Sequence, residues 1–159
     1  MRKILSTLLV ALLSIVSSMS AHTESRGAMT LGIGGGYTTA NHSAYSDIYF
    51  RYAFSSHVRI APDAGYAFKH EGLSSFNFNI DMQFPFRVTR GIGIYPLAGV
   101  AFNNWNTEGG GTHARFGLNA GAGIDLKFTR TLRLTIIGKY TFMHHTDGAY
   151  IGAGIGYNF

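Results

Sequence analysis

Residues 75–88 read SFNFNIDMQFPFRV and alternate between apolar and polar side chains. Every second residue of this stretch is apolar: Phe76, Phe78, Ile80, Met82, Phe84, Phe86 and Val88. Successive side chains of a β-strand point to opposite faces, so the pattern predicts a strand with one apolar and one polar face. The fold of the chain depends on whether this apolar face meets a protein core or lipid.

The composition narrows the class of protein. The chain has 159 residues, of which 46% are hydrophobic, 14% aromatic and 13% charged, with 21 glycines and no cysteine. This balance is typical neither of a disordered chain nor of a soluble helical domain. Without Arg2 and Lys3, which fall in the leader described next, 11 basic residues stand against 8 acidic ones. That charge is too mild and too scattered to predict nucleic-acid binding.

Residues 1–21 have the layout of a secretory signal peptide. Arg2 and Lys3 form a basic start, residues 4–16 form an apolar run, and residues 17–21 supply small residues for cleavage. The apolar run is shorter than the roughly 20 residues that a membrane-spanning helix needs. We therefore expect this leader to be removed and residues 22–159 to form a single domain.

The period-two pattern recurs over the rest of the chain. It is clear over residues 58–69, 116–128, 132–142 and 151–159, and weaker over residues 28–37, 46–54 and 92–102. With residues 75–88, these segments predict eight strands. Short connections near residues 55–57, 89–91 and 129–131 alternate with longer polar ones at residues 38–44, 70–75, 104–113 and 143–148. Short turns at one end and longer loops at the other are typical of outer-membrane barrels.

The polar face of these strands decides which way the apolar face points. It is rich in Gly, Ala and Asn, whereas a soluble sheet covers its polar face with Lys, Glu and Thr. The interior of an eight-stranded barrel is just wide enough for side chains to fill it, so small residues suit it. Charges buried there must be paired. The predicted lumen network consists of Asp47, Arg51, Arg59, Asp63, Asp81, Arg87, Arg115, Asp125, Lys127, Arg133 and Lys139.

With a polar lumen, the apolar face turns outward to lipid. The sequence therefore predicts an all-β fold, an eight-stranded antiparallel up-and-down transmembrane β-barrel. Aromatic residues are expected in two girdles that flank the aliphatic belt. The loop-end girdle is predicted from Tyr37, Tyr45, Tyr66, Phe68, Phe76, Phe102, Trp105 and Phe142, and the turn-end girdle from Phe54, Phe86, Phe128, Tyr157 and Phe159. The alternative is a soluble lipocalin-like barrel, which turns its apolar face inward around a ligand.

Two features of the predicted strands need an explanation. Pro62, Pro85 and Pro96 fall inside strands, where each removes a hydrogen-bond donor, and a closed barrel has no free edge for them. Tyr95 and Leu97 are bulky although they belong to the inward-facing set of their strand.

The final residues, GAYIGAGIGYNF, alternate apolar and small residues and end in an aromatic one. They resemble the closing strand of small bacterial outer-membrane proteins, and residues 22–159 as a whole resemble the OmpA/OmpX-type, porin-family barrels of Gram-negative bacteria. The resemblance implies a monomeric cell-envelope protein in contact with outer-membrane lipid and lipopolysaccharide. It also implies an assembly signal at Ile155, Tyr157 and Phe159, which the barrel-assembly machinery reads during biogenesis. Because folds host many activities, it implies no particular function.

The leading functional interpretation is a structural or surface-interaction role with a filled lumen, at most a narrow pore, and no enzymatic activity or cofactor. The alternative is a lipid A deacylase, because residues 143–148, MHHTDG, faintly resemble the His-x-Ser-Asn motif of those eight-stranded enzymes. His144 would activate Thr146, but no later Asp or Glu is present to orient the histidine. No metal site is predicted, since the adjacent His144 and His145 would face opposite ways on a strand.

Overall fold

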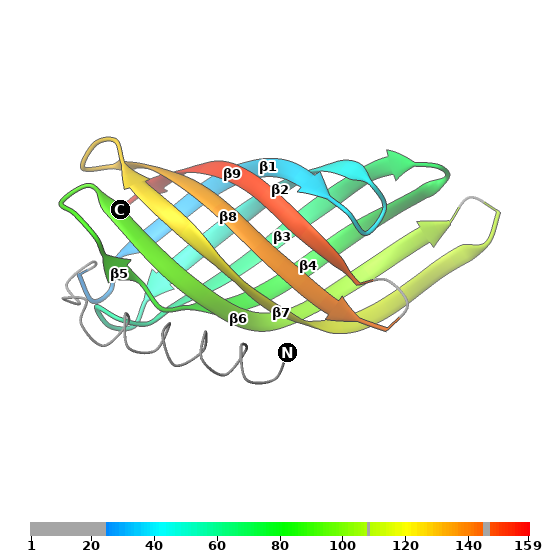
Figure 1. The fold of residues 1–159 in the computed structure, drawn as a ribbon, viewed down its shortest axis with the longest axis horizontal. Helices are drawn as coiled ribbons and strands as arrows, with labels where there is room; N and C mark the ends of the chain where they lie inside the picture. The colour runs from blue at the N-terminus through cyan, green and yellow to red at the C-terminus, as the bar shows by residue number, and fades with distance from the viewer. Residues whose placement is uncertain (1–24, 108, 145–146) are drawn as a thin grey trace, which may run out of the picture.

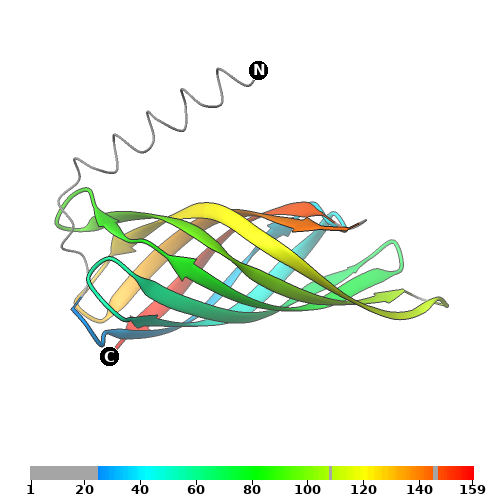
Figure 2. The same ribbon diagram turned by 90° about the horizontal axis from the view of Figure 1, so that it is seen from below.

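The computed structural model describes residues 25–107, 109–144 and 147–159, so the predicted leader and Thr146 lie outside it. The described chain is a closed barrel of antiparallel strands, viewed from two sides in Figures 1 and 2. The strands are β1 (Met29–Thr38), β2 (Ser43–Ala53), β3 (Arg59–His70), β4 (Leu73–Gln83), β5 (Phe86–Arg87), β6 (Ile92–Thr107), β7 (Gly111–Lys127), β8 (Leu132–Met143) and β9 (Gly148–Asn158). In the described chain, no helix is long and apolar enough to cross a membrane.

Each strand pairs with its neighbours in sequence order, and pairing of β1 with β9 closes the barrel. β4 and the two-residue β5 pair in succession with β6, so together they form one strand of the wall. The barrel therefore has eight wall strands, and the predicted fold is confirmed.

The break between β4 and β5 has a cause in the two prolines that meet there. Phe84 donates its backbone N–H to the Pro96 carbonyl at 3.0 Å, but Pro96 has no N–H to return to Phe84. Pro85 follows at once, and the same register resumes where Phe86 pairs with Ile94. The nitrogen of Pro85 faces the β3 side, but the β3–β4 ladder already ends at the pair of Arg59 and Gln83. The N–H that Pro85 lacks would therefore have no partner in β3.

The third proline interrupts the β2–β3 ladder. The ladder runs to the pair Tyr49 and Asp63 and resumes at Tyr52 and Ile60 in the same register. In an antiparallel ladder, hydrogen-bonded pairs alternate with non-bonded ones. Counting from the Phe54–Val58 bond of 3.0 Å, Pro62 stands at a hydrogen-bonded position and cannot donate. The barrel wall thus accepts all three prolines without a change of register.

Burial follows the period-two pattern. Along β4 the outward residues Phe76, Phe78, Ile80 and Met82 are 37–51% exposed, while Ser75, Asn77, Asn79, Asp81 and Gln83 are at most 7% exposed. The apolar side chains therefore face outward and the polar ones face the lumen. Tyr95 and Leu97 face inward and are 1% and 4% exposed.

Lumen glycines make room for the inward-facing tyrosines. A Cβ added to Gly32 would lie 2.3 Å from the Tyr49 ring, and one added to Gly123 would lie 2.2 Å from the Tyr95 ring. Both glycines stand directly opposite the tyrosine on the neighbouring strand. Gly152 makes room for Tyr150 of its own strand, because a Cβ added to Gly152 would lie 2.1 Å from the Tyr150 hydroxyl oxygen. The glycines and tyrosines of the lumen are therefore complementary in shape.

The three connections at the turn end share one geometry. In each turn, two successive backbone N–H groups donate to one carbonyl, which belongs to Val58, Ile92 or Leu132. Each turn also begins with a hydroxyl residue: Ser55, Thr89 or Thr129. Its hydroxyl oxygen accepts a hydrogen bond from the backbone N–H of a residue two or three positions later. Local hydroxyl acceptors of this kind explain why these short sequences turn.

At the other end, the strands run further than the sequence suggested. β3 and β4 are joined by Glu71 and Gly72 alone, with φ of 49° and 79°, the positive values that a type I′ hairpin turn requires. β6 continues to Thr107, and β7 already begins at Gly111. The predicted polar loops at residues 70–75 and 104–113 are therefore wrong. Figure 1 shows the β3–β4 and β6–β7 hairpins extending furthest at this end.

Candidate functional site: the lumen

The turn half of the lumen contains a cluster built around Asp125, referred to below as the turn-half cluster. Three guanidinium groups reach this one carboxylate: Arg51 at 3.1 Å, Arg59 at 2.7 Å and Arg133 at 3.3 Å. They come from β2, β3 and β8, while Asp125 belongs to β7. The cluster therefore ties together strands on opposite sides of the barrel.

Neutral side chains complete the turn-half cluster. Thr135 donates its hydroxyl to Asp125 Oδ1 at 2.8 Å and accepts from Arg51 Nη1 at 3.0 Å. Arg59 Nε donates to Gln83 Oε1 at 2.5 Å, and its guanidinium lies 4.5 Å from the Tyr95 ring centroid. A guanidinium over an aromatic face gains further attraction. The three arginines are at most 5% exposed, so the whole cluster is buried.

The loop half of the lumen contains the opposite arrangement, referred to below as the loop-half cluster. Here one ammonium group, Lys139 Nζ, lies 3.1 Å from Asp63 Oδ2 and 3.1 Å from Asp81 Oδ2. Asn79 donates to Asp63 at 2.6 Å, and Asn119 donates to Asn79 at 3.0 Å and to Asp81 at 2.8 Å. The two amides thus bridge the two carboxylates, which leaves the second oxygen of each for the ammonium group.

The two clusters border a cavity of about 30 Å³ in the middle of the lumen. Charged residues of both clusters line it, together with Asp47, which is only partly buried. A polar cavity of this size holds about one or two water molecules. The lumen is therefore filled from one cluster to the other.

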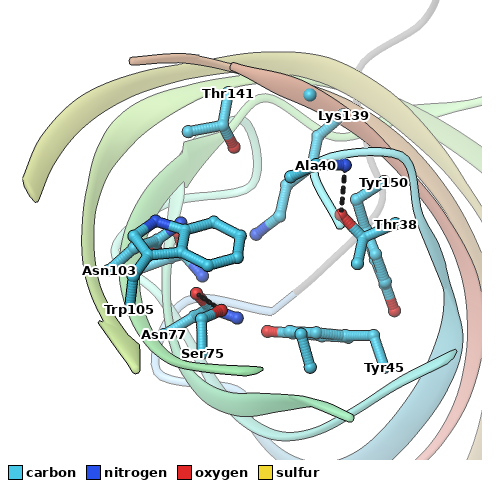
Figure 3. A pocket seen from close by; sticks show the side chains of 13 residues that line it. Thr38, Ala40, Tyr45, Ser75, Asn77, Asn103, Trp105, Lys139, Thr141 and Tyr150 are labelled. Carbon is cyan, nitrogen blue, oxygen red and sulfur yellow. Dashed lines mark hydrogen bonds between the residues drawn. The ribbon is translucent and has the colours of Figure 1, made fainter. Parts of the chain in front are cut away.

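Three aromatic side chains, those of Tyr45, Trp105 and Tyr150, line a cavity of about 40 Å³ at the loop end of the lumen together with polar residues (Figure 3). Trp105 and Tyr45 lie on its walls and are 3% and 6% exposed, and the Tyr45 ring lies 4.7 Å from that of Tyr150. Lys139, a member of the loop-half cluster, also lines this cavity. Trp105 and Tyr45 therefore face the lumen, and their assignment to the lipid-facing girdle is wrong.

The predicted lumen network is only partly assembled. Seven of its eleven residues are buried in the two clusters: Arg51, Arg59, Asp63, Asp81, Asp125, Arg133 and Lys139. Arg87 and Lys127 are exposed instead. They lie at the turn-end mouth, so their inclusion in a buried network is corrected. Arg115 is half-buried near the loop end and donates to the His144 carbonyl.

Several uncharged residues that the alternation of the sequence assigns to the lumen also belong to the two clusters. Asn79, Gln83, Asn119 and Thr135 are at most 4% exposed and bond directly to the charged groups. Asn79, Gln83 and Thr135 lie two residues from a predicted charged residue of the same parity, Asp81 or Arg133, and Asn119 lies four residues from Arg115. Parity places these side chains in the lumen, but it does not say which charged group each one bonds.

The residues of the deacylase alternative are described only in part. His144 is exposed at the loop end, and Thr146 lies outside the described residues. The carboxylate that follows, Asp147, accepts a hydrogen bond from the Tyr140 hydroxyl. Among the residues with described positions, no group of three or more His, Cys, Asp or Glu could hold a metal ion.

Comparison with solved structures places the fold among transmembrane barrels. The N-terminal barrel domain of Pseudomonas aeruginosa OprF is 20% identical with a TM-score of 0.74, covering 86% of this chain and 100% of that one. Neisserial surface protein A is 13% identical with a TM-score of 0.73, again covering 86% and 100%. Yersinia pestis Ail, the attachment invasion locus protein, is 14% identical with a TM-score of 0.64, covering 85% and 100%. No protein-family model and no curated sequence matches the chain.

The fold is that of the small eight-stranded outer-membrane β-barrels, as the residues and their resemblance predicted. At these identities, the comparison extends to the fold and not to an activity.

Proposed function

We propose that this protein is a monomeric integral outer-membrane barrel with a structural or surface-contact role, and that its lumen passes no bulk solute. The observation that carries the proposal is the filled lumen. Two bonded clusters cross it, and the cavities at its middle and at its loop end measure about 30 and 40 Å³. The proposal assigns no catalytic activity and no cofactor to the chain.

The proposal includes a route to the membrane. The leader carries the chain across the inner membrane and is cleaved, and the barrel-assembly machinery reads the last strand. Ile155, Tyr157 and Phe159 support this role, because their side chains are 49%, 49% and 72% exposed on the outside of the barrel. Phospholipid and lipopolysaccharide then cover the outward apolar face. The turn end faces the periplasm, as in outer-membrane barrels generally, and the long β6–β7 hairpin lies on the extracellular side of the membrane.

Conductance in a planar lipid bilayer tests the filled lumen. The purified mature chain is expected to give no steps comparable to those of an open porin. Trp105→Ala, which opens only the loop-end aromatic wall, is expected to behave in the same way because both charged clusters remain. A stable open channel from the unaltered chain would contradict the proposal.

Refolding into lipid vesicles tests the lipid-facing surface. Ile80→Arg places a charge on the outward face of β4 and should cost about 2–4 kcal/mol. Val88→Arg is the matched control, because Val88 is 51% exposed next to the turn at Thr89. A charge near the interface should cost about 0–1 kcal/mol. Equal costs for the two variants would count against burial of this face in lipid.

A further inference from the structure

The turn-end mouth of the barrel is an open basin of about 1050 Å³, referred to below as the turn-end basin. Its lining comes from the approach to β1 and from all three turns. Six of its lining residues are cationic: Arg26, Arg87, Arg90, Lys127, Arg130 and Arg133. Among the described residues that line it, no side chain is acidic. Six of the 11 Lys and Arg residues beyond the leader thus line one mouth of the barrel.

The floor of the basin adds to this positive charge. Arg133 lines the basin and also belongs to the turn-half cluster, where three guanidinium groups share the single carboxylate of Asp125. An excess of cations therefore lies directly beneath the exposed ones. In a mouth walled by protein, such charges reinforce one another and raise the local concentration of anions.

The opposite end of the barrel is different. Its described cations outside the buried clusters are Lys69 and Arg115, and the exposed carboxylates of Glu71 and Asp147 lie at the same end. Cations and anions are mixed there, so no comparable field develops. The cationic mouth is therefore a property of the turn end and not of the whole surface.

We propose that the turn-end basin binds phosphate-bearing anions. Five of the six cations are arginines, whose planar forks match phosphate oxygens, and a phosphate can be reached from several turns at once. Hydroxyl donors are at hand as well, since Ser56 and Thr129 line the same basin. Mutual repulsion of the clustered cations is relieved when the anion binds. The inference goes beyond the proposed function and does not depend on which end of the barrel faces the periplasm.

The phosphate can come from a free anion or from the headgroup of an anionic phospholipid. The first arm of the test is calorimetric titration of inorganic pyrophosphate into the mature chain in a neutral detergent. Arg90→Gln with Arg130→Gln removes two charges from the turns, and Lys69→Gln with Arg115→Gln removes two from the other end. The turn variant should bind about tenfold more weakly, while the control should change less than about twofold.

The second arm uses nanodiscs of phosphatidylcholine with and without phosphatidylglycerol. Native mass spectrometry counts the phosphatidylglycerol molecules that remain on the released protein. A loss confined to the turn variant supports a lipid headgroup as the source, and a pyrophosphate effect without such a loss supports a free anion. If neither arm separates the turn variant from its control, the proposal is overturned. Because all four substituted residues lie outside the buried clusters, both variants are expected to fold.

Discussion

The two halves of the lumen are built on the same plan with the charges reversed. In the turn half one carboxylate serves three guanidinium groups, whereas in the loop half one ammonium group serves two carboxylates. Neither half is neutral by itself. The excess cations of one half face the excess anions of the other across the cavity that Arg51, Asp63 and Asp81 line. The loop half therefore offsets one of the two excess positive charges of the turn half.

The largest effect is expected from Asp125→Asn. The substitution keeps the shape of the side chain but leaves three buried guanidinium groups without their carboxylate. Loss of one partner from a buried ion pair costs about 3–5 kcal/mol, because the remaining charge stays in a medium of low dielectric constant. Urea unfolding in lipid vesicles measures the loss, with Trp105, the sole tryptophan, as the fluorescent reporter. A loss below about 1 kcal/mol would mean that the cluster does not hold the strands together.

Lys139→Met should cost somewhat less at neutral pH. It leaves Asp63 and Asp81 buried beside each other without the ammonium group, but the amides of Asn79 and Asn119 still bond to them. At neutral pH the expected loss is about 3 kcal/mol.

The same urea titration at neutral pH measures the loss for both variants. A loss for Lys139→Met that exceeds the loss for Asp125→Asn would contradict the greater weight given to the turn-half cluster.

Two glycines allow the cost of an added methyl group to be compared between the lumen face and the lipid face. Gly121 and Gly138 lie on the neighbouring strands β7 and β8 but on opposite faces. A Cβ on Gly121 would lie 2.3 Å from the Gly138 carbonyl oxygen, whereas a Cβ on Gly138 meets nothing within 4 Å. Gly121→Ala should therefore cost about 1–3 kcal/mol and Gly138→Ala about 0.5 kcal/mol or less. Equal effects in vesicle refolding would contradict the tight packing of the lumen.

The smallest contrast is expected between two threonines, one in each half of the lumen. Thr135 is 2% exposed and bonds to both Asp125 and Arg51, so Thr135→Val should cost about 1–3 kcal/mol. Thr141 is only half-buried and donates to Asn119 alone at 2.8 Å. Thr141→Val should therefore cost about 0.5–1 kcal/mol. Vesicle unfolding of the two isosteric variants would show whether the turn half is the more tightly bonded one.

The fold could be predicted because its pattern is local. Residues 75–88 need only a period of two to assign every side chain to a face, and the structure agrees from Ser75 to Gln83. Trp105 and Tyr45 lie next to predicted loops, which favours a girdle position, but their parity places them in the lumen. Trp105 has the same parity as Tyr95 and Leu97, and β6 continues past it to Thr107. Counting along the strand places it inside the barrel.

The pairing of charges could not be predicted, because it depends on geometry that parity does not contain. Arg51 and Asp125 are 74 residues apart and meet only through the stagger of strands around the barrel. Arg87 and Lys127 have the same inward parity as Asp125, yet they lie at the mouth and are exposed. Depth along the barrel axis separates them, and it is set by where each strand begins and ends.

The seam between the first and last strands differs from the other pairings. On its lumen side, glycine faces glycine three times, in the pairs Gly32 and Gly156, Gly34 and Gly154, and Gly36 and Gly152. Such pairs look alike if one strand slides by two residues, so they cannot fix the alignment of the final closure. The outward pairs, such as Leu31 with Tyr157 and Ile33 with Ile155, differ in shape and can. Alignment at barrel closure in this chain therefore rests on these outward pairs, which lipid covers once the cylinder is complete, and on the lumen-side hydrogen bond from Thr30 to Asn158 at 2.6 Å near the turn end.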